Sequence, residues 1–177
     1  MKIDELLDHV IGLEGGYTND SRDSGGETNW GITIFVAREE GYNGRMQDMT
    51  REQAKQIYLR RYWVKPKFTD ISARSPTIAA ELFDTGVNCG TATAGMMLQR
   101  ALNVLMGAEL KTDGAIGPAT LTTLDRYRAK RGAEGDNVLL KALNCLQGER
   151  YIDLAERFPK NQAFVYGWIK NRVELCA

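Results

Sequence analysis

Residues 3–33 decide the fold, and they read IDELLDHVIGLEGGYTNDSRDSGGETNWGIT. Apolar residues in the first part of this stretch recur at i, i+3, i+4, i+7 and i+8, the spacing of one face of an α-helix: Ile3, Leu6, Leu7, Val10 and Ile11. Gly15 and Gly16 end this helix. Glycine and small polar residues dominate positions 15–32, so we expect a long polar loop or a small β-hairpin there.

The rest of the chain has helical periodicity and helix-capping signals. Thr50-Arg51-Glu52-Gln53 is a capping box that predicts a helix over 51–63, and Ser75-Pro76 begins a helix that runs toward Gly86. Further helices are expected at 34–40, 91–105, 118–128, 137–157 and 161–174, with a glycine-containing connector at 130–136. The pattern predicts a mainly helical domain with one small loop or hairpin after its first helix.

Composition and charge exclude several classes of protein. The chain has 177 residues, of which 43% are hydrophobic and 26% charged, as is usual for a globular domain. Lys and Arg number 23, as do Asp and Glu, so the basic excess of a nucleic-acid-binding protein is lacking. No apolar run approaches the roughly 18 residues of a membrane span. Two acids follow Lys2, so we expect no targeting segment.

The single histidine, His9, excludes further chemistry. Zinc sites with two or three histidines cannot form, and a Ser–His or Cys–His dyad would depend on His9 alone. Three widely spaced cysteines fit neither a zinc knuckle nor a disulfide framework, and we expect free, mostly buried thiols: Cys89, Cys145 and Cys176. We therefore expect no metal and no cofactor, and we expect carboxylates to carry any proton chemistry.

Glu14 is the first candidate for that chemistry. At about 100° per residue it falls in the middle of the apolar stripe of the first helix, in its last turn. Burial and the negative end of the helix dipole both raise the pKa of a carboxyl group, and such a group can serve as a general acid. The alternative is a glutamate that pairs with an arginine, or a frayed helix end.

The polar stretch adds a second carboxylate and a hydroxyl, because Asp23 and Thr28 lie nine and fourteen residues after Glu14. A buried acid with a second carboxylate nearby suits glycoside hydrolysis. Tyr17 and Trp30 offer rings for stacking on sugars, although isolated aromatics are more often packing residues. The alternatives for the aspartates are turn-forming residues or weak calcium ligands.

These residues resemble the signature of glycoside hydrolase family 108, a family of phage-type endolysin muramidases that are sometimes labelled secretion activators. The resemblance covers residues 3–90 and rests on Glu-Gly-Gly-Tyr at 14–17, Asn-Asp at 19–20 and Asp-x-Gly-Gly-x-Thr-Asn-x-Gly-Ile-Thr at 23–33. It implies an α+β lysozyme-like fold, hydrolysis of the β-1,4 bond between N-acetylmuramic acid and N-acetylglucosamine, and Glu14 as the catalytic acid.

The same resemblance guides the remaining site residues. The spacing Glu-x8-Asp-x4-Thr is similar to the Glu-x8-Asp-x5-Thr triad of phage-type lysozymes, one residue short before the threonine. The predicted catalytic set is Glu14, Asp23 and Thr28, and the predicted substrate-binding set is Tyr17, Asp20, Asn29 and Trp30. Glu27 is left out of the catalytic set.

The second half resembles small peptidoglycan-binding domains. The matching residues are Leu98-Gln99, Leu102-Asn103 and Asp113-Gly114-x-x-Gly117-Pro118-x-Thr120. The alternative is a helix–turn–helix clamp that completes the core. We predict a catalytic part at 1–92 and a peptidoglycan-binding-like part at 93–177, packed into one globule.

The predicted partner is the glycan strand of peptidoglycan, and a monomer is the default. We expect synthesis in the cytoplasm without a signal peptide and action on the cell wall after holin-type release or lysis. A lytic transglycosylase, a non-catalytic peptidoglycan-binding or secretion-assisting protein, and a chitinase of related fold are the alternatives.

Overall fold

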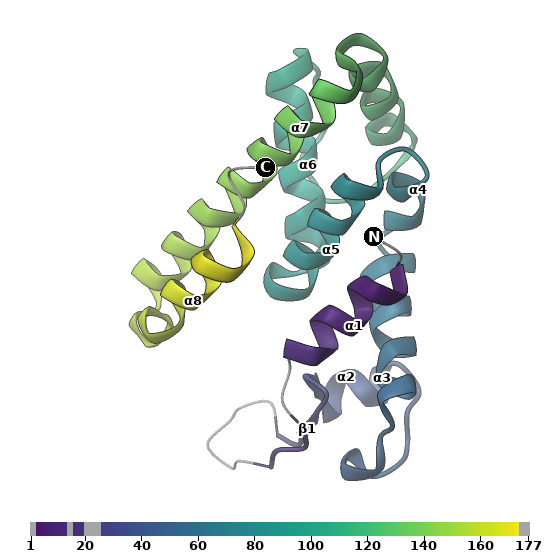
Figure 1. Cartoon of the computed structure of the whole chain (residues 1–177), viewed down its shortest axis with the longest axis vertical. Coiled ribbons are helices and arrows are strands. Elements are labelled where there is room, and N and C mark those ends of the chain that lie inside the picture. The colour runs from purple at the N-terminus through teal and green to yellow at the C-terminus, as the bar shows by residue number, and fades with distance from the viewer. Residues whose placement is uncertain (1–2, 14–15, 20–25, 174–177) are drawn as a thin grey trace. The chain divides into compact units, whose positions relative to one another are not determined.

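A computed structural model describes residues 3–13, 16–19 and 26–173 (Figure 1). These residues form eight α-helices, three short helical turns of other types and one two-stranded antiparallel sheet. The predicted mainly helical fold with a small hairpin after the first helix is therefore confirmed. The chain divides into two compact units, Met1–Lys65 and Pro66–Ala177, which are described separately below.

The first unit contains three α-helices and the hairpin. Its elements are α1 (Ile3–Leu13), β1 (Thr28–Asn29), β2 (Ile32–Thr33), α2 (Ile34–Glu39), the 3-10 turn η1 (Met46–Asp48), α3 (Arg51–Tyr58) and the π-helical turn η2 (Leu59–Val64). The apolar stripe of α1 lies in the interior, with Leu7, Val10 and Ile11 no more than 2% exposed. The period that predicted this helix therefore also predicted its buried face.

Ion pairs join α1 to α3. The Asp8 carboxylate pairs with Arg51 and lies 2.7 Å from the Lys55 ammonium. The hydrogen bond from Lys55, together with the contacts with Arg51, holds the pKa of Asp8 below its usual value, although burial acts in the opposite direction. The Thr50–Gln53 capping box is present at the start of α3, and the helix predicted over 51–63 ends as the η2 turn.

The hairpin has the register Thr28–Thr33 and Asn29–Ile32. Its two turn residues, Trp30 and Gly31, have φ values of 53° and 73°. Positive φ at both central positions is the geometry of a type I′ turn, whose twist matches that of the flanking strands. A side chain at Trp30 in this region is uncommon, so the surrounding contacts must hold it.

All regular elements in the described residues of the second unit are helices. Its elements are α4 (Phe68–Ser72), α5 (Pro76–Cys89), α6 (Thr91–Met106), α7 (Pro118–Arg157), the 3-10 turn η3 (Pro159–Asn161) and α8 (Gln162–Arg172). The sequence did not predict α4. The expected connector at 130–136 is reduced to a kink at Gly132, whose φ of 61° and ψ of −154° are non-helical.

Helices α5, α6 and α7 pack together around Phe83, Leu98 and Leu124, all of which are fully buried. Cys89 is half-buried, and burial raises its pKa to about 11. Cys145 is exposed, so the prediction of a mostly buried thiol is wrong there, because its side chain lies on the outer face of α7. Cys176 lies outside the described residues.

The described residues contain neither a candidate membrane span nor a candidate metal cluster. None of their helices is both long and apolar enough to cross a membrane. Within the same residues, no group of three or more histidine, cysteine, aspartate or glutamate side chains is placed to hold a metal ion.

Candidate functional site

The hairpin of the first unit is anchored through Asn29 at the end of β1 and through the turn residue Trp30. The buried Asn29 side chain donates from Nδ2 to the Met46 carbonyl oxygen at 2.7 Å, and the Trp30 indole Nε1 donates to the Met49 carbonyl at 2.9 Å. The Tyr58 hydroxyl of α3 donates to the Trp30 carbonyl at 3.3 Å. These three bonds fix the turn on the η1 segment and on α3, and they explain how the left-handed conformation of Trp30 is held.

A backbone bridge closes the stretch that precedes the hairpin. Thr18 N donates to the Thr28 carbonyl at 2.8 Å, and Thr28 N donates to the Thr18 carbonyl at 2.9 Å. The Thr28 hydroxyl donates to the Gly26 carbonyl at 3.4 Å. The backbones of Thr18 and Thr28 are therefore held side by side next to β1.

In the second unit, the residues of the peptidoglycan-binding-like motif form a hydrogen-bonded clamp around Gln99, which is 2% exposed. Its Nε2 lies 3.2 Å from Asp113 Oδ1, 3.0 Å from the Ala115 carbonyl and 3.3 Å from Thr120 Oγ1. Its Oε1 accepts from Gly114 N at 2.8 Å. One amide of α6 thus holds both the 113–115 turn and the first turn of α7.

Asp113 belongs to the same clamp. Its carboxylate accepts from Ala115 N at 3.0 Å. This backbone hydrogen bond, followed by the one from Gln99, keeps the pKa of Asp113 below its usual value. The turn is thereby stabilised by an ionised aspartate at neutral pH.

Asn103, one turn further along α6, closes the preceding loop. Its Nδ2 donates to the Leu110 carbonyl at 2.9 Å, and its Oδ1 accepts from Leu110 N at 2.7 Å. The side-chain amide therefore pairs with both backbone groups of Leu110 as a neighbouring strand would. The polar motif residues of this half stabilise the 107–117 loop, as the clamp interpretation of the motif expects.

Comparison with known proteins assigns a family to each part of the chain. The model of glycosyl hydrolase 108 matches residues 7–90. This part of the chain is therefore similar to the glycosyl hydrolase 108 family. The model of a predicted peptidoglycan domain matches residues 93–173, which contain the Gln99 clamp. Together the two families support a protein that acts on or binds peptidoglycan. Within the described residues, no helix is long and apolar enough to cross a membrane.

A solved structure has a similar fold over nearly the whole chain. The structure of SagA from Brucella abortus superimposes with a TM-score of 0.69, at 24% sequence identity, over 97% of this chain and 92% of that chain. The likeness shows that this chain and SagA share a fold. A search of curated proteins found no match.

The structure describes four of the seven predicted site residues of this glycosyl hydrolase 108 part. Tyr17 is 40% exposed, Thr28 and Trp30 are half-buried, and Asn29 is 4% exposed. Glu14, Asp20 and Asp23 lie outside the described residues.

Two of the four residues, Asn29 and Trp30, form hydrogen bonds that stabilise the protein itself. The polar groups of Asn29 and Trp30 hold the hairpin, and their contacts with substrate stay predictions. This anchoring could not be predicted from the residue types, because the acceptors are backbone carbonyls 17 and 19 residues away.

We expect Asn29→Ala to destabilise the first unit by about 2 kcal/mol, because it leaves the Met46 carbonyl without its donor in the interior. Trp30→Phe keeps the ring and removes only the Nε1 donor, so a smaller loss of about 1 kcal/mol is expected. Urea unfolding followed by circular dichroism measures both. Equal unfolding midpoints for Asn29→Ala and the unmodified chain would contradict the anchoring role.

Proposed function

We propose that the chain is a peptidoglycan muramidase that hydrolyses the β-1,4 bond between N-acetylmuramic acid and N-acetylglucosamine. Glu14 is the general acid of this reaction. The proposal is supported by the match of residues 7–90 to glycosyl hydrolase 108, together with the peptidoglycan domain that follows.

The observation that carries the role of Glu14 is the buried stripe of α1. Val10 and Ile11 are 1% and 0% exposed, and Glu14 follows Ile11 by three and Val10 by four positions. Residues at these spacings share one face of a helix. Burial of a carboxyl group favours its protonated form, which is the form that a general acid needs.

The remaining groups of the proposed reaction come from residues 20–28. The Glu14 proton passes to the glycosidic oxygen as its bond to the anomeric carbon breaks. A carboxylate of the loop, Asp23 with Asp20 as the alternative, stabilises the oxocarbenium-like state or orients the attacking water. Water gives its hydroxyl to the anomeric carbon and its second proton to a carboxylate. The backbone bridge to Thr18 holds Thr28, whose hydroxyl is the remaining group of the proposed set.

Mass spectrometry of the products tests this assignment. Purified sacculi digested with the full chain are expected to yield muropeptides that end in reducing N-acetylmuramic acid. Products lighter by one water, with 1,6-anhydro ends, would identify a lytic transglycosylase instead. Binding to sacculi without release of any reducing sugar would identify a non-catalytic peptidoglycan-binding protein.

A further inference from the structure

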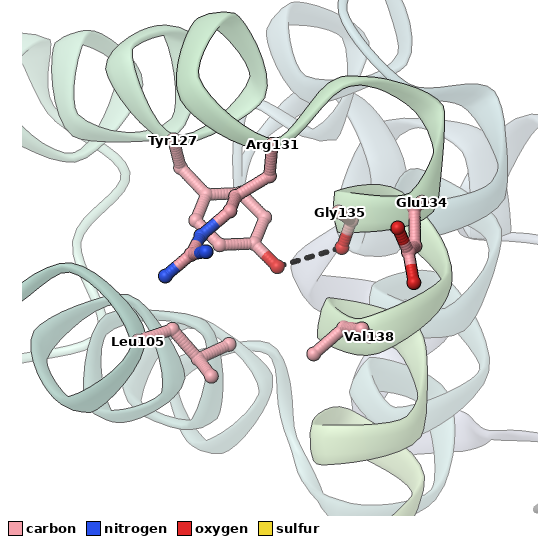
Figure 2. A pocket seen from close by; sticks show the side chains of 6 residues that line it. All are labelled: Leu105, Tyr127, Arg131, Glu134, Gly135 and Val138. Atoms are coloured by element: carbon pink, nitrogen blue, oxygen red, sulfur yellow. Dashed lines mark hydrogen bonds between the residues drawn. The ribbon is translucent and has the colours of Figure 1, made fainter.

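A pocket of about 310 Å³ opens in the second unit, where α7 bends beside the end of α6. Figure 2 shows its six lining residues: Leu105, Tyr127, Arg131, Glu134, Gly135 and Val138. This volume lies at the lower end of the range for small-molecule sites. The pocket lies within the part matched by the predicted peptidoglycan domain.

Two glycines build the pocket. Gly132 has the left-handed φ that allows α7 to bend there, so that Tyr127 and Arg131 precede the bend while Glu134 and Val138 follow it (Figure 2). At Gly135 a Cβ atom would overlap with Cβ of Arg131, so only glycine fits this close approach. The Tyr127 hydroxyl donates to the Gly135 carbonyl at 2.7 Å and fastens the two arms of the bend together.

Some polar groups in and beside the pocket already have partners within the described part of the protein, and others do not. Tyr127 is 1% exposed and its hydroxyl is committed to Gly135. Arg128 and Asp136, beside the pocket, pair with each other at 3.0 Å. Arg131 and Glu134, in contrast, are exposed and make no ion pair with each other or with any other described side chain.

The pocket thus presents one positive and one negative group beside an aromatic ring, with Leu105 and Val138 as its apolar walls (Figure 2). A ligand that satisfies it carries a carboxylate for Arg131 and an ammonium group for Glu134, since each charge gains most from a hydrogen-bonded partner of opposite sign. An uncharged sugar ring would leave both Arg131 and Glu134 without a partner of opposite charge.

We propose that this pocket binds the peptide stem of peptidoglycan, through a stem residue that carries both an ammonium and a carboxylate group. The inference rests on the proposed function only in taking peptidoglycan as the ligand. Where a peptide stem is attached, the lactyl carboxyl group of N-acetylmuramic acid is part of the amide bond to the stem, so the free carboxylates and amines lie on the peptide. In this proposal the pocket binds the peptide, and the first unit acts on the glycan.

Calorimetric titration of the full chain with two probes tests the proposal. One probe is the disaccharide tetrapeptide with diaminopimelic acid at its third position, and the other is the same disaccharide without peptide, its lactyl carboxyl group capped as an amide so that it is uncharged. We expect the peptide-bearing probe to bind at least ten-fold more tightly. Arg131→Gln and Glu134→Gln are each expected to weaken its binding about ten-fold, without changing the affinity for the bare disaccharide.

Modified probes connect each charge to its partner. Acetylating the free amine of the stem is expected to weaken binding to the unmodified chain but not to Glu134→Gln. Amidating the stem carboxylates is expected to weaken binding to the unmodified chain but not to Arg131→Gln. A modification that weakens binding equally in every variant would overturn the assigned contacts.

Matched controls are Lys130→Gln and Glu149→Gln, which remove one exposed charge of each sign on α7 outside the pocket. If the controls weaken binding as much as the pocket variants, or if both probes bind equally, the inference is wrong. Its failure is separable from that of the proposed function. If the chain lyses sacculi but does not prefer the peptide-bearing probe, only the inference about the pocket is wrong. If it prefers that probe but does not lyse sacculi, only the proposed muramidase activity is wrong.

Discussion

Glu14→Gln is expected to lower the rate of cell-wall lysis by roughly three orders of magnitude, the scale of losing a general acid. The amide has nearly the same shape as the carboxyl group but has no acidic proton for the glycosidic oxygen. Because the substitution adds no volume and no charge, the fold is expected to persist. Turbidity loss of a sacculus suspension measures the rate, and the thermal midpoint by circular dichroism measures the fold.

Glu27→Gln is the matched control for this experiment. Glu27 is another carboxylate of the same stretch, and its backbone carbonyl accepts from Ile34 N at 2.7 Å, a bond that the substitution preserves. Its lytic rate is expected to equal that of the unmodified chain. An undiminished rate in Glu14→Gln would remove the general-acid assignment, and an equal loss in both variants would indicate a general effect of charge.

Local rules were sufficient to predict the elements around this site. The buried face of α1 follows from its apolar period, and the Thr50 capping box follows from its residue types alone. The roles of Asn29 and Gln99 did not follow, because both depend on where distant segments meet. Asn29 bonds to a carbonyl, which every residue has, so the sequence contains no mark of its partner.

The two irregular points of the second unit show a similar limit. Helix α4 begins after Lys67, a residue with φ of 62° and thus in a region that non-glycine residues rarely occupy. The sequence gives no reason to expect a helix to begin there. Gly132, in contrast, lies inside the predicted connector, but its neighbours keep helical geometry on both sides. The non-helical connector is therefore shorter than the 130–136 segment that the glycines predicted, because helix propensity and packing keep the neighbours of Gly132 helical.

Gly95→Ala is expected to destabilise the second unit by about 3 kcal/mol or more, since a Cβ atom at this position would overlap with the Gly114 carbonyl. Gly114 cannot give way easily. It has a φ of 80° and itself lies against the Ala92 carbonyl, and its N–H is held by Gln99 at 2.8 Å. Urea unfolding followed by circular dichroism measures the loss, and hydrogen exchange of the α6 amides locates it.

Gly167→Ala separates this clash from the general effect of alanine in a helix. Gly167 lies within α8, and nothing is within 4 Å of the position that its Cβ would take. Alanine there is expected to stabilise the chain by about 0.5–1 kcal/mol, through helix propensity alone. Opposite signs for the same substitution would show that α6 and the 113–115 turn are in contact, whereas two gains would show that they are not.

The same pair of variants connects the clamp to the pocket. Leu105, one wall of the pocket, is on α6, and the remaining lining residues are on α7. The clamp fastens α6 to the start of α7, so a displaced α6 moves Leu105 away from Tyr127 and Arg131. Gly95→Ala is therefore expected to weaken binding of the peptide-bearing probe even at temperatures where the variant is folded, whereas Gly167→Ala leaves it unchanged. Unaltered binding in folded Gly95→Ala would mean that α7 alone forms the binding surface.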